Sequence, residues 1–205
     1  RKETFQELVQ KGLGGFLVRN MESYGILDAM GLTYRIVLDA NIYTMNNRAE
    51  AFWMKKGILG DTVPLELNAK ELVHRNNKNS ELTVYGYTPM MVSVQCVQKT
   101  MDHCNHACVQ YVLKDRYQKE FRGVCSCEFC YNTIYNTLPT SLLKEKEKAE
   151  KLGVKAYRLS FTIETQQETE KIVRAFVDVY LRGQKPDGQM QTEETTKGHF
   201  QRGVE

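Results

Sequence analysis

The 205-residue chain has few of the features that mark membrane, fibrous or disordered proteins. It contains only 4 Pro, and no apolar run approaches the roughly 20 residues that a membrane-spanning helix needs. Its 28 basic and 25 acidic residues leave a net charge of +3, which is too small to indicate nucleic-acid binding by charge alone. Hydrophobic residues make up 41% and charged residues 26%, which is typical of a globular domain with a sizeable core.

Several signatures of well-known site types are also missing from the sequence. There is no GxGxxG or Walker A loop, so no phosphate-binding loop supports a nucleotide-binding function. There is no GxSxG elbow and no HExxH helix, which mark two large classes of hydrolase. Because no signal-peptide pattern is present, we expect a cytoplasmic protein without a membrane partner. The first residue is Arg1 and not a methionine, which predicts a fragment of a larger protein or a processed product.

Short apolar runs alternate with helical patterns along most of the chain. Strands are predicted over residues 16–18, 35–39, 63–67, 81–87 and 157–161, and helices over residues 3–12, 21–30, 46–56, 69–75, 142–152 and 168–182. This alternation is typical of an α/β protein with a parallel sheet covered by helices. A complete (β/α)8 barrel takes about 250 residues and eight strands. The sequence therefore predicts a partial TIM-like barrel, its C-terminal part, and a small doubly wound α/β domain is the competing interpretation.

On this interpretation the chain has four parts. Residues 1–87 form βα units of the partial barrel, residues 88–140 a cysteine-rich insertion, residues 141–182 the final βα region and residues 183–205 a C-terminal loop segment. An incomplete parallel sheet leaves an unpaired edge strand near Phe16, and such edges pair with other chains. We therefore expect a homo-oligomer, unless the missing N-terminal half of the barrel covers this edge.

The insertion contains every cysteine of the chain, namely Cys96, Cys104, Cys108, Cys125, Cys127 and Cys130. Disulfides are disfavoured, because no secretion signal is visible and a chain of this size does not need them. Six buried cysteines without a shared function are also disfavoured, because so many rarely occur within one short segment. Cys127 and Cys130 form a CxxC pair, which can place two thiolates on one metal. Cys96 and Cys104 supply an upstream pair, and His103 and His106 flank Cys104 as further candidates for zinc.

Four blocks of the sequence, in order, resemble the U32 peptidase family, the collagenase-like proteases of bacteria. They are residues 89–96, 113–121, 127–136 with the following Pro139 and Leu142, and 196–205. The resemblance covers the whole chain, aligned with the second half of the family's barrel. It implies a TIM-barrel-like core and a peptidase that acts on protein or peptide substrates, in some members on collagen. Other members assist RNA or quinone hydroxylation, and several of those bind a [4Fe–4S] cluster through four cysteines.

The resemblance also implies a ligand set. Cys96, Cys104, Cys127 and Cys130 are the candidate ligands of a [4Fe–4S] cluster, with zinc as the alternative metal, and Cys108 and Cys125 are expected to be ordinary thiols. Better-known branches of the family carry a further cysteine about seven residues before the position of Cys96, where this chain has none. On this interpretation Cys104, which follows Cys96 in the sequence, replaces that missing cysteine as a ligand.

Candidate catalytic groups follow from the expectation that functional residues lie at the carboxyl ends of parallel strands. Glu66, in an otherwise apolar predicted strand, is the candidate acid or base, and a rim glutamate paired with Lys or Arg is the alternative. His199 is a candidate general base, metal ligand or loop contact. Substrate-binding candidates are Asn41, Asn68, Tyr87 and Arg202. The sequence thus predicts a U32-type peptidase, and the alternative is an iron–sulfur protein of RNA or quinone hydroxylation with RNA as a partner.

Overall fold

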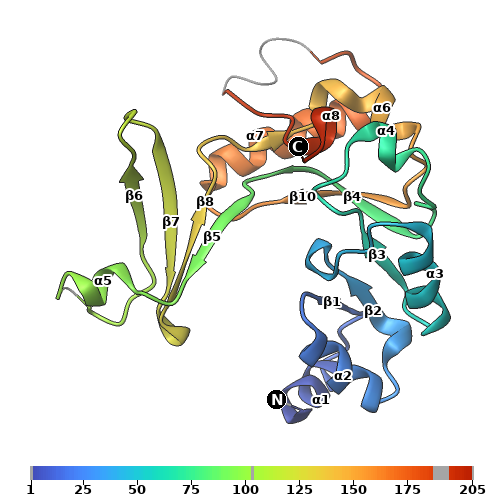
Figure 1. Cartoon of the computed structure of the whole chain (residues 1–205), viewed down its shortest axis with the longest axis horizontal. Coiled ribbons are helices and arrows are strands. Elements are labelled where there is room, and N and C mark those ends of the chain that lie inside the picture. Colours follow the sequence, from blue (N-terminus) through green and yellow to red (C-terminus); the bar gives the residue numbers. More distant parts are fainter. Residues whose placement is uncertain (1, 103, 187–193, 205) are drawn as a thin grey trace. The chain divides into compact units, whose positions relative to one another are not determined.

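The computed structural model describes residues 2–102, 104–186 and 194–204, which form two compact units (Figure 1). The first unit holds Arg1–Thr83, Glu145–Arg158 and Gly198–Glu205, and the second holds Val84–Lys144 and Leu159–Lys197. One sheet has the order β1-β2-β3-β4-β10, with β9 on β4, and the other has the order β5-β8-β7-β6. Among the described residues, every helix is too short or too polar to cross a membrane.

The elements of the first unit confirm a parallel α/β architecture. The strands β1 (Phe16–Val18), β2 (Ile36–Leu38), β3 (Gly60–Thr62) and β4 (Ser80–Gly86) pair in parallel in chain order. The helices are α1 (Lys2–Gln10), α2 (Met21–Ala29), α3 (Asn47–Lys55), α4 (Ala69–Leu72), α6 (Lys146–Glu150) and α8 (His199–Arg202). Within the described residues, the strands do not close into a barrel.

The core of this unit lies between the sheet and two helices. Val18 and Leu38 are paired across β1 and β2 and project from the same face of the sheet. They belong to one buried cluster with Leu27 of α2 and Trp53 of α3, so both helices cover that face. Tyr24 of α2 meets Trp53 edge to face, with 4.8 Å between the ring centroids. Burial of these apolar side chains is the main stabilising contribution here.

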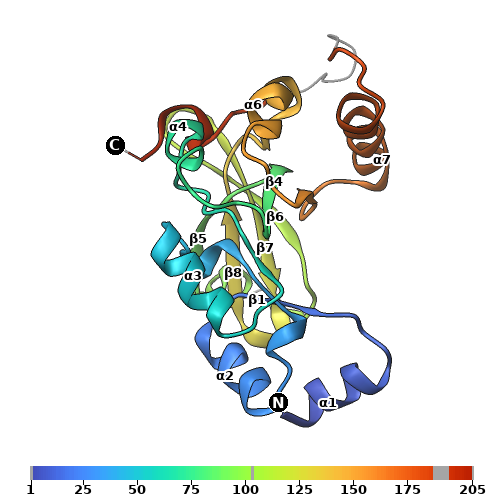
Figure 2. The same cartoon turned by 90° about the vertical axis from the view of Figure 1, so that its right-hand side faces the viewer.

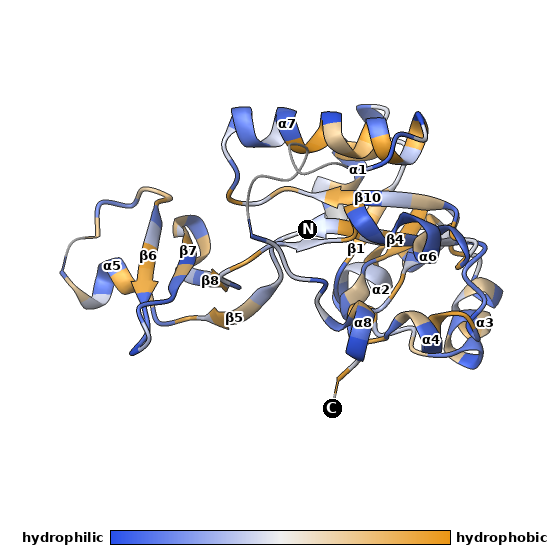
Figure 3. Cartoon of the chain, turned by 90° about the horizontal axis from the view of Figure 1, so that it is seen from above, coloured by the Kyte–Doolittle hydropathy of each residue, from blue (hydrophilic) through white to orange (hydrophobic). Residues whose placement is uncertain are grey.

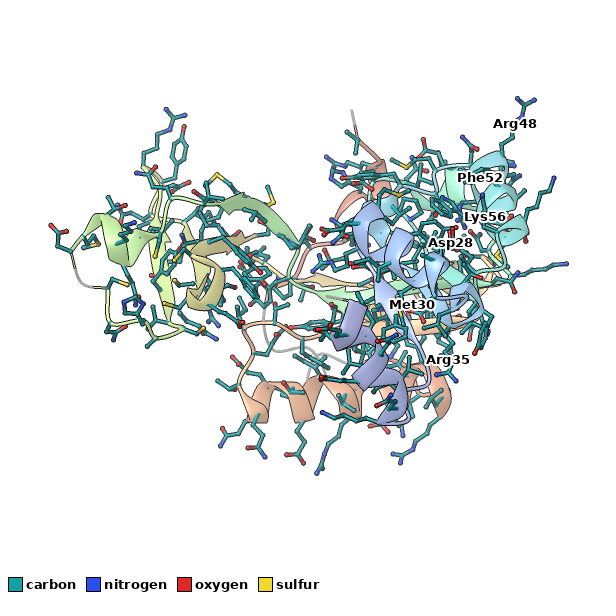
Figure 4. All side chains as sticks on the ribbon, turned by 90° about the horizontal axis from the view of Figure 1, so that it is seen from below. Asp28, Met30, Arg35, Arg48, Phe52 and Lys56 are labelled. Carbon is teal, nitrogen blue, oxygen red and sulfur yellow. The ribbon has the colours of Figure 1, made fainter. Side chains whose placement is uncertain are left out.

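The outer side of α3 is solvated. Arg48, Phe52 and Lys56 follow one another at intervals of four along the helix and its C-cap, and Figure 4 labels them on the outer surface. The ammonium of Lys56 lies 5.7 Å from the centroid of the Phe52 ring, so the exposed aromatic ring is partly covered by a cation.

Asparagine side chains begin three of the helices. Asn20 accepts a hydrogen bond from the backbone N–H of Ser23, and Asn46 does the same for α3. Asn68 caps α4 through a reciprocal capping box with Glu71. Each cap satisfies N–H groups that the first helical turn leaves without partners.

A buried ionic network links β3 to the segment after α4. Arg75 pairs with Asp61 and donates to Ser80 Oγ at 2.9 Å and to the Thr44 carbonyl at 2.8 Å. Ser80 Oγ in turn donates to Asp61 at 2.6 Å. The side chains of Arg75 and Asp61 are only 2% and 3% exposed, so these hydrogen bonds are what makes the buried charges tolerable.

The prediction of a strand over residues 63–67 is wrong. The strand is Gly60–Thr62, and Leu65 and Glu66 form a turn after it. Pro64 has no N–H to donate to a ladder, which opposes a strand through this segment. Gly60 permits close pairing instead, because a Cβ at that position would lie 2.2 Å from the carbonyl oxygen of Asn79.

The second unit contains the cysteine segment as an antiparallel sheet, which, as predicted, forms no βα unit. Its strands are β5 (Pro89–Ser93), β6 (Gln110–Lys114), β7 (Glu120–Ser126) and β8 (Tyr131–Tyr135), and the short helix α5 (Val97–Thr100) follows β5. Figure 3 shows hydrophobic residues along β5 and β6. The other elements here are β9 (Thr140–Ser141) and α7 (Gln166–Phe176). The strand β10 (Ala156–Ser160) begins in the first unit and ends in the second.

Three further boundaries differ from the sequence prediction. The helix predicted over residues 142–152 is shorter, because Leu143–Glu145 is a separate 3₁₀ turn before α6. The helix predicted over residues 168–182 begins earlier, because Thr165 caps it, and it continues as a π-helical turn, Val177–Leu181. The segment predicted as a loop over residues 183–205 contains α8 and a bridge from Thr140 to Thr196, and its residues 187–193 lie outside the described chain.

Candidate metal centre

Two loops of the second unit bring sulfur and imidazole together. Cys104 and His106 lie in the loop between α5 and β6, and Cys127 begins the 3₁₀ turn Cys127–Phe129 between β7 and β8. One ligand atom from each of these three residues lies within 4.8 Å of the other two. Tetrahedral zinc with thiolates at about 2.3 Å places neighbouring ligand atoms roughly 3.8 Å apart, so only small movements would close the group around an ion.

Cys127 lies at the middle of the cysteine group. Its side chain is buried, whereas Cys104 and His106 are exposed. Burial raises the pKa of the Cys127 thiol, and the neighbouring thiols, led by Cys104 and Cys108, raise it further. A divalent metal relieves this repulsion, because it binds the thiolate and supplies the missing positive charge. Without a metal the raised pKa keeps the Cys127 thiol protonated, so metal binding there would release its proton.

Cys96 and Cys125 form a second pair of thiols. Their Sγ atoms are 3.6 Å apart, and both side chains are buried against Cys127 and Val109. Burial raises the pKa of Cys125 to about 12, and the hydrogen bond with Cys96 adds to the effect. The pKa of Cys96 is lowered instead, chiefly because the backbone N–H of Lys99 at the start of α5 stabilises its thiolate.

The structure brings together part of the predicted ligand set. Cys104 and Cys127 lie in the three-residue group, and Cys96 lies beside Cys125, which was expected to be an ordinary thiol. Cys130 is exposed, with its Sγ 3.7 Å from the carbonyl oxygen of Cys127. Of the two flanking histidines, His106 joins the group, and residue 103 lies outside the described chain.

Several predicted catalytic and substrate-binding residues belong to neighbouring segments at one corner of the first unit, the turn after β3, α4 and α8. Glu66 lies in the turn after β3, and its Oε2 atom is buried without a hydrogen-bond partner in the described chain. Two residues on, Asn68 caps α4, and α8 lies beside α4 in both views (Figures 1 and 2). The approach is close, because a Cβ at Gly203 would lie 2.8 Å from Asn68 Nδ2.

His199 and Arg202 both belong to α8 at this corner. His199 Nδ1 lies 2.8 Å from the carbonyl oxygen of Gly203. A carbonyl only accepts hydrogen bonds, so Nδ1 carries the proton and Nε2 is the basic nitrogen of the neutral ring. The contact holds the His199 ring against the end of α8. It also leaves Nε2 as the nitrogen that could accept a proton.

The remaining candidates lie apart from these groups. Asn41 accepts a hydrogen bond from Arg19 at 3.3 Å, next to the carboxylate of Asp39. Tyr87 follows β4 in the second unit and is half-buried.

Sequence reasoning missed an ionic cluster on the face of the parallel sheet opposite α2 and α3. Arg158 of β10 lies 2.9 Å from the Asp39 carboxylate, donates to Thr62 at 2.9 Å and pairs with Glu81. Its charge is therefore matched, and the cluster ties β10 to residues in or next to β2, β3 and β4. The signal was Arg158 within a predicted strand whose alternate residues Tyr157, Leu159 and Phe161 are hydrophobic.

Comparison with known proteins leaves the family of the chain unassigned. No protein-family model, curated protein or solved structure matches it. The resemblance to the U32 peptidases therefore stays a prediction, and so do the site roles taken from it.

The two thiol groups should differ in reactivity. In brief labelling of the metal-free chain with iodoacetamide near neutral pH, we expect Cys104, Cys108 and Cys130 to react first, because they are exposed. Cys125 should react last, because a pKa of about 12 leaves almost no thiolate at that pH. Peptide mass spectrometry measures each site, and labelling of Cys125 as fast as Cys108 in the folded protein would contradict the arrangement.

Proposed function

We propose that the cysteine segment is a metal-binding module in which Cys104, His106 and Cys127 hold a divalent ion. The observation that supports it is the convergence of two thiols and one imidazole from two separate loops. The neighbouring thiols raise the pKa of Cys127, and a bound cation would offset this effect because it stabilises the thiolate.

Cys130 is the proposed fourth ligand. It follows Cys127 in the CxxC turn, and its side chain already lies near the Cys127 carbonyl. The resulting set of three cysteines and one histidine is one that structural zinc sites use. The presence of His106 favours zinc over the [4Fe–4S] cluster that the resemblance implies, because such clusters are usually held by four thiolates. A complete four-ligand shell would make the role of the metal structural, holding the loop after α5 against the turn after β7.

Metal content and affinity test this proposal. Anaerobically purified full chain should contain one zinc per chain and no acid-labile sulfide. Cys127→Ser should weaken zinc binding at least tenfold, measured by competition with a chromogenic chelator, because a ligand thiolate is lost. Cys108→Ser is the matched control from the same segment, and its affinity should stay within about twofold.

Either of two results would overturn the assignment. Equal zinc affinity in Cys127→Ser and the unchanged chain would show that these thiols are not the ligands. Iron and acid-labile sulfide in equal amounts would show that the site holds an iron–sulfur cluster and not zinc.

We also propose, as a second function, that the first unit belongs to a partial (β/α)8 barrel of a U32-type peptidase. Strands β1 to β4 follow one another in chain order, as in a barrel, whereas a doubly wound sheet reverses its order at a switch point. The observation that favours chemistry at this edge is Glu66 beyond the end of β3, whose buried Oε2 atom has no hydrogen-bond partner among the residues that the structure describes. A carboxyl group in such a place can move a proton, and His199 lies on α8 at the same corner.

Peptide hydrolysis tests the second proposal. Glu66→Gln should lower kcat about 100-fold or more for any peptide that the full-length protein cleaves, because loss of a general acid or base costs this much. Its melting temperature should not fall, since the altered oxygen has no partner to lose. Glu7→Gln, on the exposed side of α1, is the control, and equal activity of the two variants would remove Glu66 from the mechanism.

A further inference from the structure

A cavity of about 260 Å³ opens on one face of the antiparallel sheet, beside α5. It is lined by Met91, Ser93, Gln95, Val97, Thr100, Met101, Tyr111, Leu113, Asn132 and Ile134. None of these residues is acidic, basic or histidine, so the lining favours a neutral occupant. None of them belongs to the proposed metal group or to the corner around Glu66.

The strand register builds the floor of the cavity. Met91 pairs with Ile134, Ile134 with Gly123, and Gly123 with Tyr111, so the four residues form one row across β5, β8, β7 and β6. Residues paired in this way project from the same face of a sheet. The row therefore presents methionine, isoleucine and tyrosine side chains to the cavity.

Gly123 makes room for the Tyr111 ring. A Cβ at position 123 would lie 2.3 Å from Cζ of Tyr111 and 2.7 Å from its hydroxyl oxygen. The ring and its hydroxyl therefore lie over Gly123 of β7. A larger residue at position 123 would push the ring away, so the placement of this hydroxyl is built into the sequence of β7.

Two buried polar atoms at the cavity have no partner among the described residues. They are Asn132 Oδ1 and the Tyr111 hydroxyl oxygen. Asn132 is only 1% exposed, and its Nδ2 donates to the Gln95 carbonyl at 2.9 Å. That bond fixes the amide orientation, so Oδ1 is an acceptor without a donor. Leaving such a group unpaired is unfavourable, and a bound donor would remove this penalty.

The mouth of the cavity suits an aliphatic group. Met91 and Met101 are 52% and 61% exposed, whereas Ile134 at the inner end is 9% exposed. Methionine side chains are unbranched and adapt to guests of different shape. The cavity therefore combines an adaptable apolar rim with an acceptor and a hydroxyl group farther in.

We propose that this cavity binds a neutral amide that carries an aliphatic side chain. The amide N–H donates to Asn132 Oδ1, the Tyr111 hydroxyl donates to the amide carbonyl, and the aliphatic group packs between Met91, Met101 and Ile134. The volume fits one capped amino acid, below the range of about 300–1,000 Å³ typical of drug-sized ligand sites. The two sources of this chemistry are a free small amide and a single residue within a peptide chain.

The test is a titration of the full chain with N-acetyl-leucinamide, followed by NMR shifts of the Asn132 side-chain amide. Binding should saturate, and N-acetylglycinamide, which lacks the aliphatic group, should bind at least tenfold more weakly. A capped tripeptide with a central leucine distinguishes the sources: tighter binding than the single residue identifies a peptide site, and no binding identifies a free amide.

Tyr111→Phe is the decisive variant, because within the described part of the chain the hydroxyl has no hydrogen-bond partner whose loss would disturb the fold. It should weaken binding of N-acetyl-leucinamide about fivefold to tenfold, the effect of one neutral hydrogen bond. Tyr117→Phe, an exposed position in the β6–β7 hairpin, is the matched control and should leave affinity unchanged.

Two results would overturn the proposal. One is the absence of saturable binding, which would mean that ordered water alone satisfies the two polar atoms. The other is equal affinity of Tyr111→Phe and the unchanged chain. The metal content of both proteins is measured in parallel, so failure of this site is distinguishable from failure of the metal module.

Discussion

The tight turn between β7 and β8 is the constraint on which the second unit depends. Its last residue, Cys130, has a positive φ of 53°, a conformation that reverses the chain within a few residues. The reversal sets the register in which Cys125 pairs with Asn132. The same turn places Cys127 against the loop that carries Cys104 and His106.

The metal group and the cavity therefore both depend on the register between β7 and β8. A shift of one residue between β7 and β8 would turn Cys125 and Asn132 to opposite faces and remove the partners of both. Metal binding at the turn would stabilise this register, because an ion bound only by the folded arrangement favours it by mass action. In this view the metal module supports the sheet on which the cavity is built.

The sequence predicted the βα units well where apolar periodicity and helix caps coincide. Residues 16–18 were recognised as a strand and residues 21–30 as a helix, because buried side chains at regular spacing follow from the packing itself. The third strand was missed, because Gly60, Asp61 and Thr62 carry no apolar signal. Asp61 is buried with Arg75, and Thr62 accepts a hydrogen bond from Arg158. Both partners are distant in sequence, and no local pattern reports such contacts.

The candidate site was predictable only in part, for the same reason. The CxxC spacing identified Cys127, the upstream pair of cysteines suggested Cys104, and His106 was a candidate because it lies two residues after Cys104. The pairing of Cys96 with Cys125 depends on where α5 begins relative to β7, which spacing does not reveal. The cavity was invisible to sequence reasoning, because its key feature is the tyrosine ring of β6 lying over a glycine of the next strand.

X-ray absorption at the zinc edge of the metal-loaded full chain tests the central claim most directly. The account predicts a first shell of sulfur at about 2.3 Å together with nitrogen at about 2.0 Å, since cysteine and histidine both bind. A shell of nitrogen and oxygen alone, without sulfur, would contradict it.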